Sequence, residues 1–283
     1  MPRLTSLSLF LLLLFIACSK ASLDEEVQPE NSATTDANLV VSIANEQLTT
    51  TRLNFAVYDQ TDKRVKQVNQ TKAATEFGKA SFQLEPATYR LVVLAHSSDG
   101  NPTMTDPAKI QFKNNQGFTD TFLYDTTMTL GEETRTLNVS LDRVTALCRF
   151  VINDTIPEEV TQIQFYYTGG SGAFNATTRL GCVNSKQQMT FAVKAGQTHT
   201  VYDLYTFLHQ QEGTIKLTAT AFDAAGNEYC AWDFLIPMKK NQITWATGYF
   251  FADQTSSDAW AIIPTTPIDY SWSGNFYYPL ETF

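Results

Sequence analysis

The chain has 283 residues, of which 43% are hydrophobic, and it carries a formal net charge of −9. This length and this hydrophobic content are sufficient for two domains, each with its own core. The acidic balance argues against nucleic acid as a partner, because a phosphate backbone would be repelled.

The chain opens with a short apolar run. Arg3 provides a positive charge, and residues 7–17 are almost all apolar. A membrane-spanning helix needs about 20 apolar residues, so this run predicts a signal peptide covering residues 1–17. Phe15-Ile16-Ala17 before Cys18 resembles a bacterial lipobox, which implies that Cys18 is acylated and becomes the mature N-terminus. An ordinary signal peptide followed by an incidental cysteine is the alternative.

Residues 18–37 form a polar, acidic segment with almost no aromatic residues. A segment of this composition cannot bury enough apolar surface to fold, so it predicts a flexible tether that holds a domain away from a membrane. Asp24, Glu25 and Glu26 resemble a surface-export signal of Bacteroidales lipoproteins, and a solvated linker is the alternative interpretation.

Alternation of apolar and polar residues dominates the rest of the chain. In residues 53–58, Leu, Phe and Val occupy one face, and residues 89–95 are apolar on both faces, as in a central strand. Turn-forming residues, such as those at 98–101 and 225–227, separate the runs. No apolar run has helical spacing, so the sequence predicts an all-β protein made of sandwiches.

A change of phase predicts the domain boundary. Residues 137, 139 and 141 place apolar groups at odd positions, whereas the run from Val144 to Ile152 places them at even positions. A strand keeps one parity, because a slip of one residue exchanges its two faces. We therefore predict an N-terminal sandwich over residues 38–142 and a C-terminal sandwich over residues 143–283.

Three cysteines remain if Cys18 carries lipid: Cys148, Cys182 and Cys230. Three cysteines cannot all pair, so no disulfide framework is expected. At most one bridge could form, and the sequence does not select it.

Recognisable catalytic and metal-ligand motifs are missing from the sequence. The three histidines, His96, His199 and His209, lack helix-face ligand spacing, and there is no paired-cysteine zinc spacing. The glycine-rich stretch at 169–172 lacks the helix that a nucleophile elbow or a phosphate loop requires. We therefore expect no enzyme activity, no cofactor and no bound metal.

The C-terminal part is rich in aromatic residues, among them Trp260, Trp272 and Tyr277. Exposed rings in a row could stack on sugar faces. Packing in a core or an edge strand is the alternative, because large rings mostly serve packing. An assembly interface is a third interpretation, because Tyr and Trp are favoured at hot spots and a final strand can pair with another sheet edge.

Four stretches follow one another along the mature chain: LNFAVYDQTDKRV at 53–65, LEPATYRLVV at 84–93, LNVSLDRVTALCRFVI at 137–152 and SWSGNFYYPL at 271–280. In series, they resemble the Bacteroidales fimbrillin superfamily, and most closely its FimB-type family of lipoprotein anchors and minor subunits. The resemblance implies two tandem transthyretin-like β-sandwiches, export as an outer-membrane lipoprotein and a place in a surface fimbria.

The resemblance also implies a site for strand exchange. Stalk subunits of this superfamily lose their first strand by cleavage after an arginine, and a neighbour's strand fills the emptied groove. Here the first strand would contain Leu39, Val41 and Ile43, and Arg52 is the candidate cleavage arginine. Anchor members keep the strand and the lipid, and the C-terminal end at 271–280 is more similar to an anchor, so we expect an uncleaved anchor or minor subunit.

The leading hypothesis is therefore a structural subunit that joins other fimbrial subunits by β-strand complementation and the outer membrane by its lipid. Host or bacterial surface molecules are further candidate ligands. The alternative function is a surface lipoprotein that binds glycans through exposed aromatic residues. A glycosidase with an unrecognised carboxylate pair is a third hypothesis, and the missing motifs disfavour it.

Overall fold

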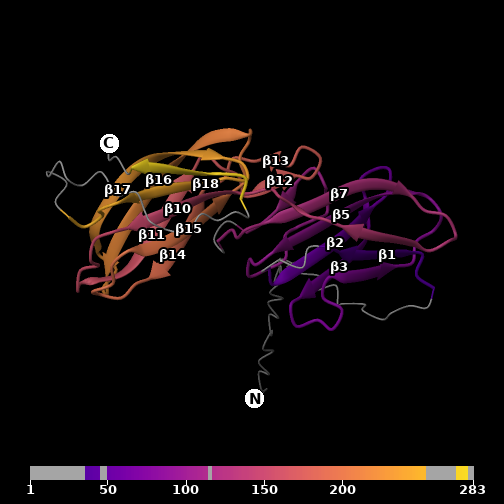
Figure 1. Ribbon diagram of the computed structural model, residues 1–283, viewed down its shortest axis with the longest axis horizontal. Helices are drawn as coiled ribbons and strands as arrows, with labels where there is room; N and C mark the ends of the chain where they lie inside the picture. The colour runs from indigo at the N-terminus through magenta and orange to yellow at the C-terminus, as the bar shows by residue number, and fades with distance from the viewer. Residues whose placement is uncertain (1–35, 45–49, 114–116, 253–271, 280–283) are drawn as a thin grey trace, which may run out of the picture.

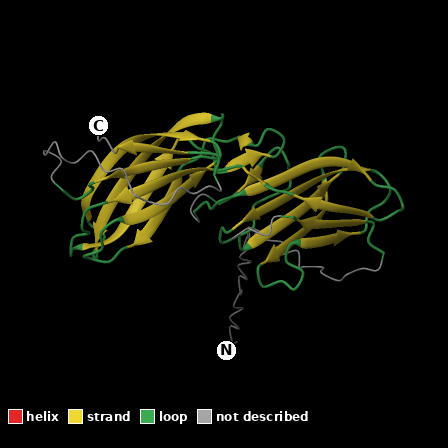
Figure 2. Cartoon of the chain, in the orientation of Figure 1, coloured by secondary structure: helices red, strands yellow, loops and turns green. Residues whose placement is uncertain are grey.

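The computed structural model describes residues 36–44, 50–113, 117–252 and 272–279, and these residues form nineteen β-strands and no helix (Figures 1 and 2). The strands gather in two halves, with the N-terminal half at the right of Figure 1 and the C-terminal half at the left. The prediction of an all-β, sandwich-like fold is confirmed.

The N-terminal half has two sheets. The smaller sheet has the strand order β4 (Lys79–Phe82), β1 (Leu39–Ile43), β8 (Arg135–Val139). The larger sheet has the order β3 (Arg64–Thr71), β2 (Arg52–Tyr58), β5 (Thr88–His96), β7 (Phe122–Thr129), β9 (Asp142–Arg143). Strand β1 runs antiparallel to β4 and parallel to β8.

Alternating apolar side chains fill the space between these two sheets. Leu39 and Val41 of β1 share one buried cluster with Leu91 of β5. Val92, on the opposite face of β5, belongs to a second buried cluster. Strand β5 is therefore buried on both faces, as its two-sided apolar pattern predicts.

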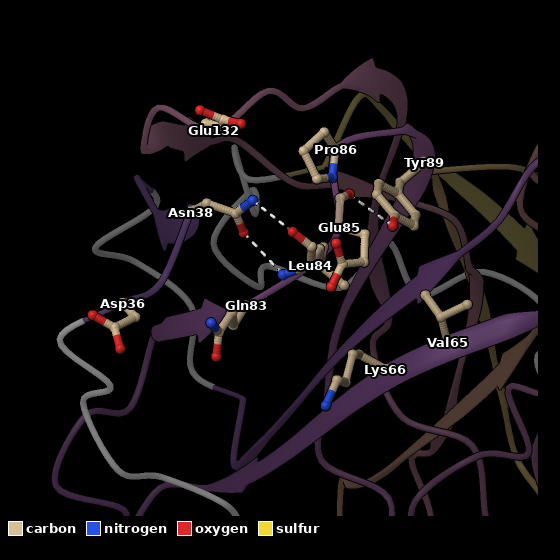
Figure 3. Close-up of a pocket in the computed structure, with 10 residues that line it drawn as sticks. All are labelled: Asp36, Asn38, Val65, Lys66, Gln83, Leu84, Glu85, Pro86, Tyr89 and Glu132. Carbon is tan, nitrogen blue, oxygen red and sulfur yellow. Dashed lines mark hydrogen bonds between the residues drawn. The ribbon is translucent and has the colours of Figure 1, made fainter.

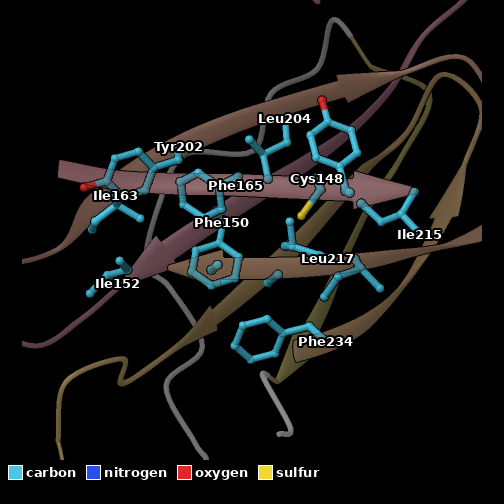
Figure 4. Close-up of a cluster of buried hydrophobic side chains, with 14 of the residues drawn as sticks. Cys148, Phe150, Ile152, Ile163, Phe165, Tyr202, Leu204, Ile215, Leu217 and Phe234 are labelled. Atoms are coloured by element: carbon cyan, nitrogen blue, oxygen red, sulfur yellow. The ribbon is translucent and has the colours of Figure 1, made fainter. Parts of the chain in front are cut away.

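The C-terminal half also has two sheets. One has the order β15 (Thr200–Thr206), β10 (Ala146–Ile152), β18 (Ile243–Gly248), β19 (Asn275–Pro279). The other has the order β14 (Gln187–Ala192), β11 (Val160–Thr168), β16 (Glu212–Asp223), β17 (Glu228–Lys239). Phe150 lies in the core between them. The centre of its ring is 5.1 Å from that of Phe165 and 5.4 Å from that of Phe234 (Figure 4).

The two halves share one topology. The order β4-β1-β8 corresponds to β15-β10-β18, and the order β3-β2-β5-β7 corresponds to β14-β11-β16-β17. The pairing directions also agree, because only the β1–β8 pair and its counterpart β10–β18 are parallel among these seven-strand sets. Weak sequence similarity between the halves therefore conceals two copies of one strand arrangement.

A small fifth sheet and an aromatic cluster connect the halves. Its strands are β13 (Leu180–Gly181), β12 (Ala173–Asn175) and β6 (Ile110–Gln111), so β6 of the N-terminal half pairs with β12 of the C-terminal half. Phe207 packs against Phe112 and Phe174, with ring centres 5.7 and 4.7 Å apart. The contact between the halves is thus both main-chain and hydrophobic.

The predicted division at residues 142–143 falls where the membership of the core changes. The main N-terminal cluster extends to Leu141, and the main C-terminal cluster begins at Ala146. Between them, β9 still pairs with β7 of the N-terminal half. That residues 38–142 and 143–283 are separate domains stays a prediction.

Candidate functional site

Strand β1 is the central strand of its sheet and is paired on both sides. Val41 is flanked by Ala80 of β4 and by Leu137 of β8. Leu39 and Val41 are fully buried, and Ile43 is half-buried against the same cluster. The structure thus brings the three predicted first-strand residues together in the N-terminal core. Removal of β1 would open an apolar groove and leave β4 and β8 without a shared partner.

Asn38 fixes the start of β1. Its side-chain nitrogen donates hydrogen bonds to the carbonyl oxygens of Leu84, at 2.7 Å, and Gly131, at 3.3 Å. Its side-chain oxygen accepts a hydrogen bond from the Leu84 N–H at 2.9 Å (Figure 3). The local sequence does not mark this asparagine, because its partners lie 46 and 93 residues away.

An open pocket of about 740 Å³ lies beside the start of β1 (Figure 3). Its lining mixes charges, with Asp36, Lys66 and Glu132 among its residues. Tyr89 also lines it and donates a hydrogen bond to the carbonyl oxygen of Glu85 at 2.9 Å. Among the described residues that line it there is no histidine, cysteine or serine.

Arg52 is the first residue of β2 and is half-buried. Its Nη2 atom donates a hydrogen bond to the carbonyl oxygen of Asp99 at 3.2 Å. The next residue, Leu53, is 1% exposed, and β2 is paired with β3 on one side and β5 on the other. The peptide bond after Arg52 therefore lies in a paired strand, and cleavage there requires this end of β2 to detach. Cleavage itself stays a prediction.

Trp272 is 7% exposed and packs against an arginine at the junction of the halves. The guanidinium carbon of Arg143 lies 3.8 Å from the centre of the Trp272 ring and 4.7 Å from that of Phe122. Arg143 also binds Asp120, with Nε and Nη2 each 2.7 Å from a carboxylate oxygen. Tyr205 stacks on Trp272 with ring centres 6.3 Å apart. This burial favours the packing interpretation of Trp272 over a sugar platform.

Tyr277 lies on β19, which pairs in parallel with β18 and forms the edge of its sheet. In the main-chain register, Tyr277 is opposite Trp245. Trp260 and Cys18 lie outside the described residues.

Cys148, Cys182 and Cys230 are all free thiols. Burial raises the pKa of Cys148 far above its ordinary value and raises the pKa of Cys230 to about 11. Both thiols are therefore protonated at neutral pH and are poor nucleophiles. Within the described ranges, no group of His, Cys, Asp and Glu side chains could hold a metal ion, and no helix could cross a membrane.

Comparison with protein families gives one match. Residues 32–229 match the model of the fimbrillin-A associated anchor proteins Mfa1 and Mfa2. A search of curated proteins finds no match.

Three solved structures of similar chains are described here, and each is 14% identical to this chain or less. A candidate adhesin from Bacteroides ovatus ATCC 8483 is 14% identical, with a TM-score of 0.49 over 70% of this chain and 82% of that one. A fimbrial assembly protein from Parabacteroides distasonis ATCC 8503 is 14% identical, with a TM-score of 0.39 over 78% and 92%. The C-terminally truncated tip fimbrial protein Mfa3 from Porphyromonas gingivalis is 12% identical, with a TM-score of 0.38 over 76% and 95%.

Proposed function

The chain belongs to the family of fimbrillin-A associated anchor proteins Mfa1 and Mfa2, and from this premise we propose that it is a structural subunit of a cell-surface fimbria. Membership in this family supports a fimbrial role. In the proposed role, the subunit is held at the outer membrane by lipid on Cys18 and is joined to other subunits by β-strand complementation.

The observation that carries the proposal is the position of β1. A strand that is central in its sheet, with Leu39 and Val41 fully buried, completes the N-terminal core from within the chain itself. Each buried aliphatic side chain of this size contributes about 1.5–3 kcal/mol. A chain that keeps β1 is therefore complete at this groove and needs no donor strand there, which suits an anchor or minor subunit better than a repeating stalk subunit.

The segment before β1 suits a membrane attachment. Between Cys18 and Asn38 there are about 20 residues, which span at most about 70 Å when fully extended. Their composition is polar and acidic. Two or more acyl chains on Cys18 would hold the protein stably, because one chain gives only reversible binding.

Replacement of Cys18 tests the attachment. In cells that make the fimbria, Cys18→Ala is expected to shift the protein from the outer-membrane fraction and to release fimbriae into the medium. Cys182→Ala is the matched control, because Cys182 is an exposed, free cysteine in the folded part of the chain. Fimbriae that stay attached equally well in both variants would contradict anchoring through Cys18.

Deletion of the whole chain tests the fimbrial role. We expect fewer or detached fimbriae in electron micrographs of the deletion strain, and restoration by the wild-type chain. Unchanged fimbriae, in number and attachment, would contradict the role.

A further inference from the structure

The two halves differ at two sheet edges: β9 joins β7 only in the N-terminal half, and β19 joins β18 only in the C-terminal half. Seven strands of the N-terminal half have counterparts in the C-terminal half, but β19 has none. Strand β19 adds in parallel to the outer edge of β18, from the pair Ile243–Asn275 to the pair Thr247–Pro279. The corresponding edge in the N-terminal half is the outer edge of β8, and no described strand pairs with it.

Strand β8 presents main-chain groups at this edge. The Arg135 N–H donates to the carbonyl oxygen of Asn38, and the Val139 carbonyl accepts from the residue after β1, so odd-numbered residues of β8 face β1. Main-chain groups alternate in direction along a strand, which points those of Thr136 and Asn138 toward the open edge. Such groups are a template for another strand.

Burial shows the same contrast. Every residue of β18 is buried. Strand β19 covers one edge of β18, and Trp272 packs in a cluster with Ile243 and Trp245 of β18. In β8, only Val139 is buried; Leu137 is half-buried, and the other three residues are exposed. Leu137 packs against the N-terminal core from a strand with an open edge, where an added strand could cover it further.

We propose that the outer edge of β8 binds an extended segment of another protein chain, which runs parallel to β8 and carries apolar side chains at alternate positions. Strand β19 indicates the chemistry of this occupant. It has five residues, as β8 has, and three successive aromatic residues at 276–278. Main-chain hydrogen bonds would supply the affinity, and the contact beside Leu137 would supply the selectivity.

This edge is distinct from the groove that β1 fills. A partner strand can add beside β8 while β1 stays in place, so an uncleaved chain still has a site for a neighbour. The inference rests on the proposed function for the identity of the natural partner, a fimbrial subunit. The binding edge itself does not depend on that identity.

A peptide with the sequence of residues 272–281 and a benzophenone photo-crosslinker at its N-terminus is the probe. It is added to the full chain and to two variants, Asn138→Pro and Asn138→Ala. Proline at position 138 removes the N–H that points toward the open edge, whereas alanine keeps it. This N–H does not bond to β1, and an edge strand tolerates proline at such a position. We expect crosslinks on residues 135–139 in the wild type and in Asn138→Ala, and at least tenfold fewer in Asn138→Pro.

Two results would overturn the proposal. One is crosslinks confined to β18, which would mean that the peptide only replaces β19. The other is equal crosslinking in the proline and alanine variants.

Amide hydrogen exchange on the wild-type chain gives a readout that does not depend on how the proline variant folds. The N–H groups of Thr136 and Asn138 are expected to exchange at least tenfold more slowly when the peptide is present, and unchanged rates would overturn the proposal. Because both assays use the purified chain and a defined peptide, their failure is separate from failure of the fimbrial role in cells.

Discussion

The guanidinium carbon of Arg143 lies 3.8 Å from the centre of the Trp272 ring. This contact connects β9, at the junction of the two halves, to the residues just before β19. The same guanidinium binds the Asp120 carboxylate through two nitrogens. A planar guanidinium can stack on an aromatic face and still bind a carboxylate through its edge, which lysine cannot do. The Arg143 side chain therefore connects β9 to Asp120 of the N-terminal half and to Trp272 near the C-terminal end of the described chain.

Arg143→Met is expected to lower the free energy of unfolding by about 2–4 kcal/mol, because it leaves the partly buried Asp120 without its charged partner. Arg149→Met is the matched control. Arg149 binds Asp203 through two nitrogens and lies 5.0 Å from the Trp245 ring, but its side chain is 22% exposed against 7% for Arg143. We expect a loss of about 1 kcal/mol there. Urea unfolding measures both, and equal losses would contradict the role given to Arg143.

His96 is fully buried in the N-terminal half and is held in its neutral form. The Ser98 N–H donates to Nδ1 at 3.2 Å, so Nε2 carries the proton and donates to Oδ1 of Asn54 at 2.9 Å. Burial, with a smaller contribution from the charge of Arg52, lowers the pKa of His96 to about 4.

Acid is therefore expected to destabilise the fold through His96. The unfolded chain takes up the proton near pH 6.5, whereas the folded chain takes it up only near pH 4, so stability falls as the pH falls through this window. The loss is about 2 kcal/mol at pH 5 relative to neutral pH. His96→Gln should flatten the curve of unfolding free energy between pH 7 and 5, while His199→Asn, at an exposed position, should keep its slope. A His96→Gln curve as steep as that of the wild type would refute this assignment.

Cleavage after Arg52 is expected to make the protein dependent on a donor strand. Loss of the fully buried Leu39 and Val41 and the half-buried Ile43 removes roughly 4–7 kcal/mol of burial, which is comparable with the whole stability of a domain. After limited proteolysis and removal of the N-terminal fragment, the melting temperature should fall by more than about 10 °C.

A synthetic peptide of residues 36–45 should restore the melting temperature of the cleaved chain. The same peptide with Ser at positions 39, 41 and 43 should not restore it, because it keeps the main chain but lacks the buried side chains. Arg52→Gln provides an uncleaved control. If the cleaved and intact chains melt at the same temperature, β1 is not the strand that completes the N-terminal core.

Asn38→Ala is expected to cost about 1–3 kcal/mol, because it leaves two carbonyl oxygens and one N–H without their side-chain partner. Asn38→Asp should cost at least as much, since a carboxylate cannot donate to the carbonyl oxygens of Leu84 and Gly131. Asn138→Ala, which removes an exposed amide from the same sheet, should leave stability unchanged. Urea unfolding distinguishes these outcomes, and an Asn38→Ala variant as stable as the wild type would contradict this role for Asn38.

Much of the fold could be predicted from the sequence because strand faces follow from local alternation. Leu53, Phe55 and Val57 face one buried cluster, as their period of two predicts. Burial of Ala56 and Tyr58 on the other face was not predicted, because the cluster at the junction of the halves that covers them is assembled from distant segments.

The candidate site could be predicted only in part, for the same reason. Local pattern identified β1 as an apolar strand, but its parallel pairing with β8 joins residues that are far apart in sequence. The contacts of Asn38 and the stacking of Arg143 on Trp272 are likewise non-local. Aromatic content alone could not distinguish a buried Trp272 from an exposed one.

The parallel pairing of β1 with β8 has a mechanical consequence. The chain enters β1 at the end where β8 also begins, and it leaves β8 toward the C-terminal half at the opposite end. A pull between the start of β1 and the C-terminal half therefore draws the two strands lengthwise in opposite directions. Their hydrogen bonds bear such a load together instead of opening one after another, so the N-terminal half resists traction applied between the start of β1 and the end of β8.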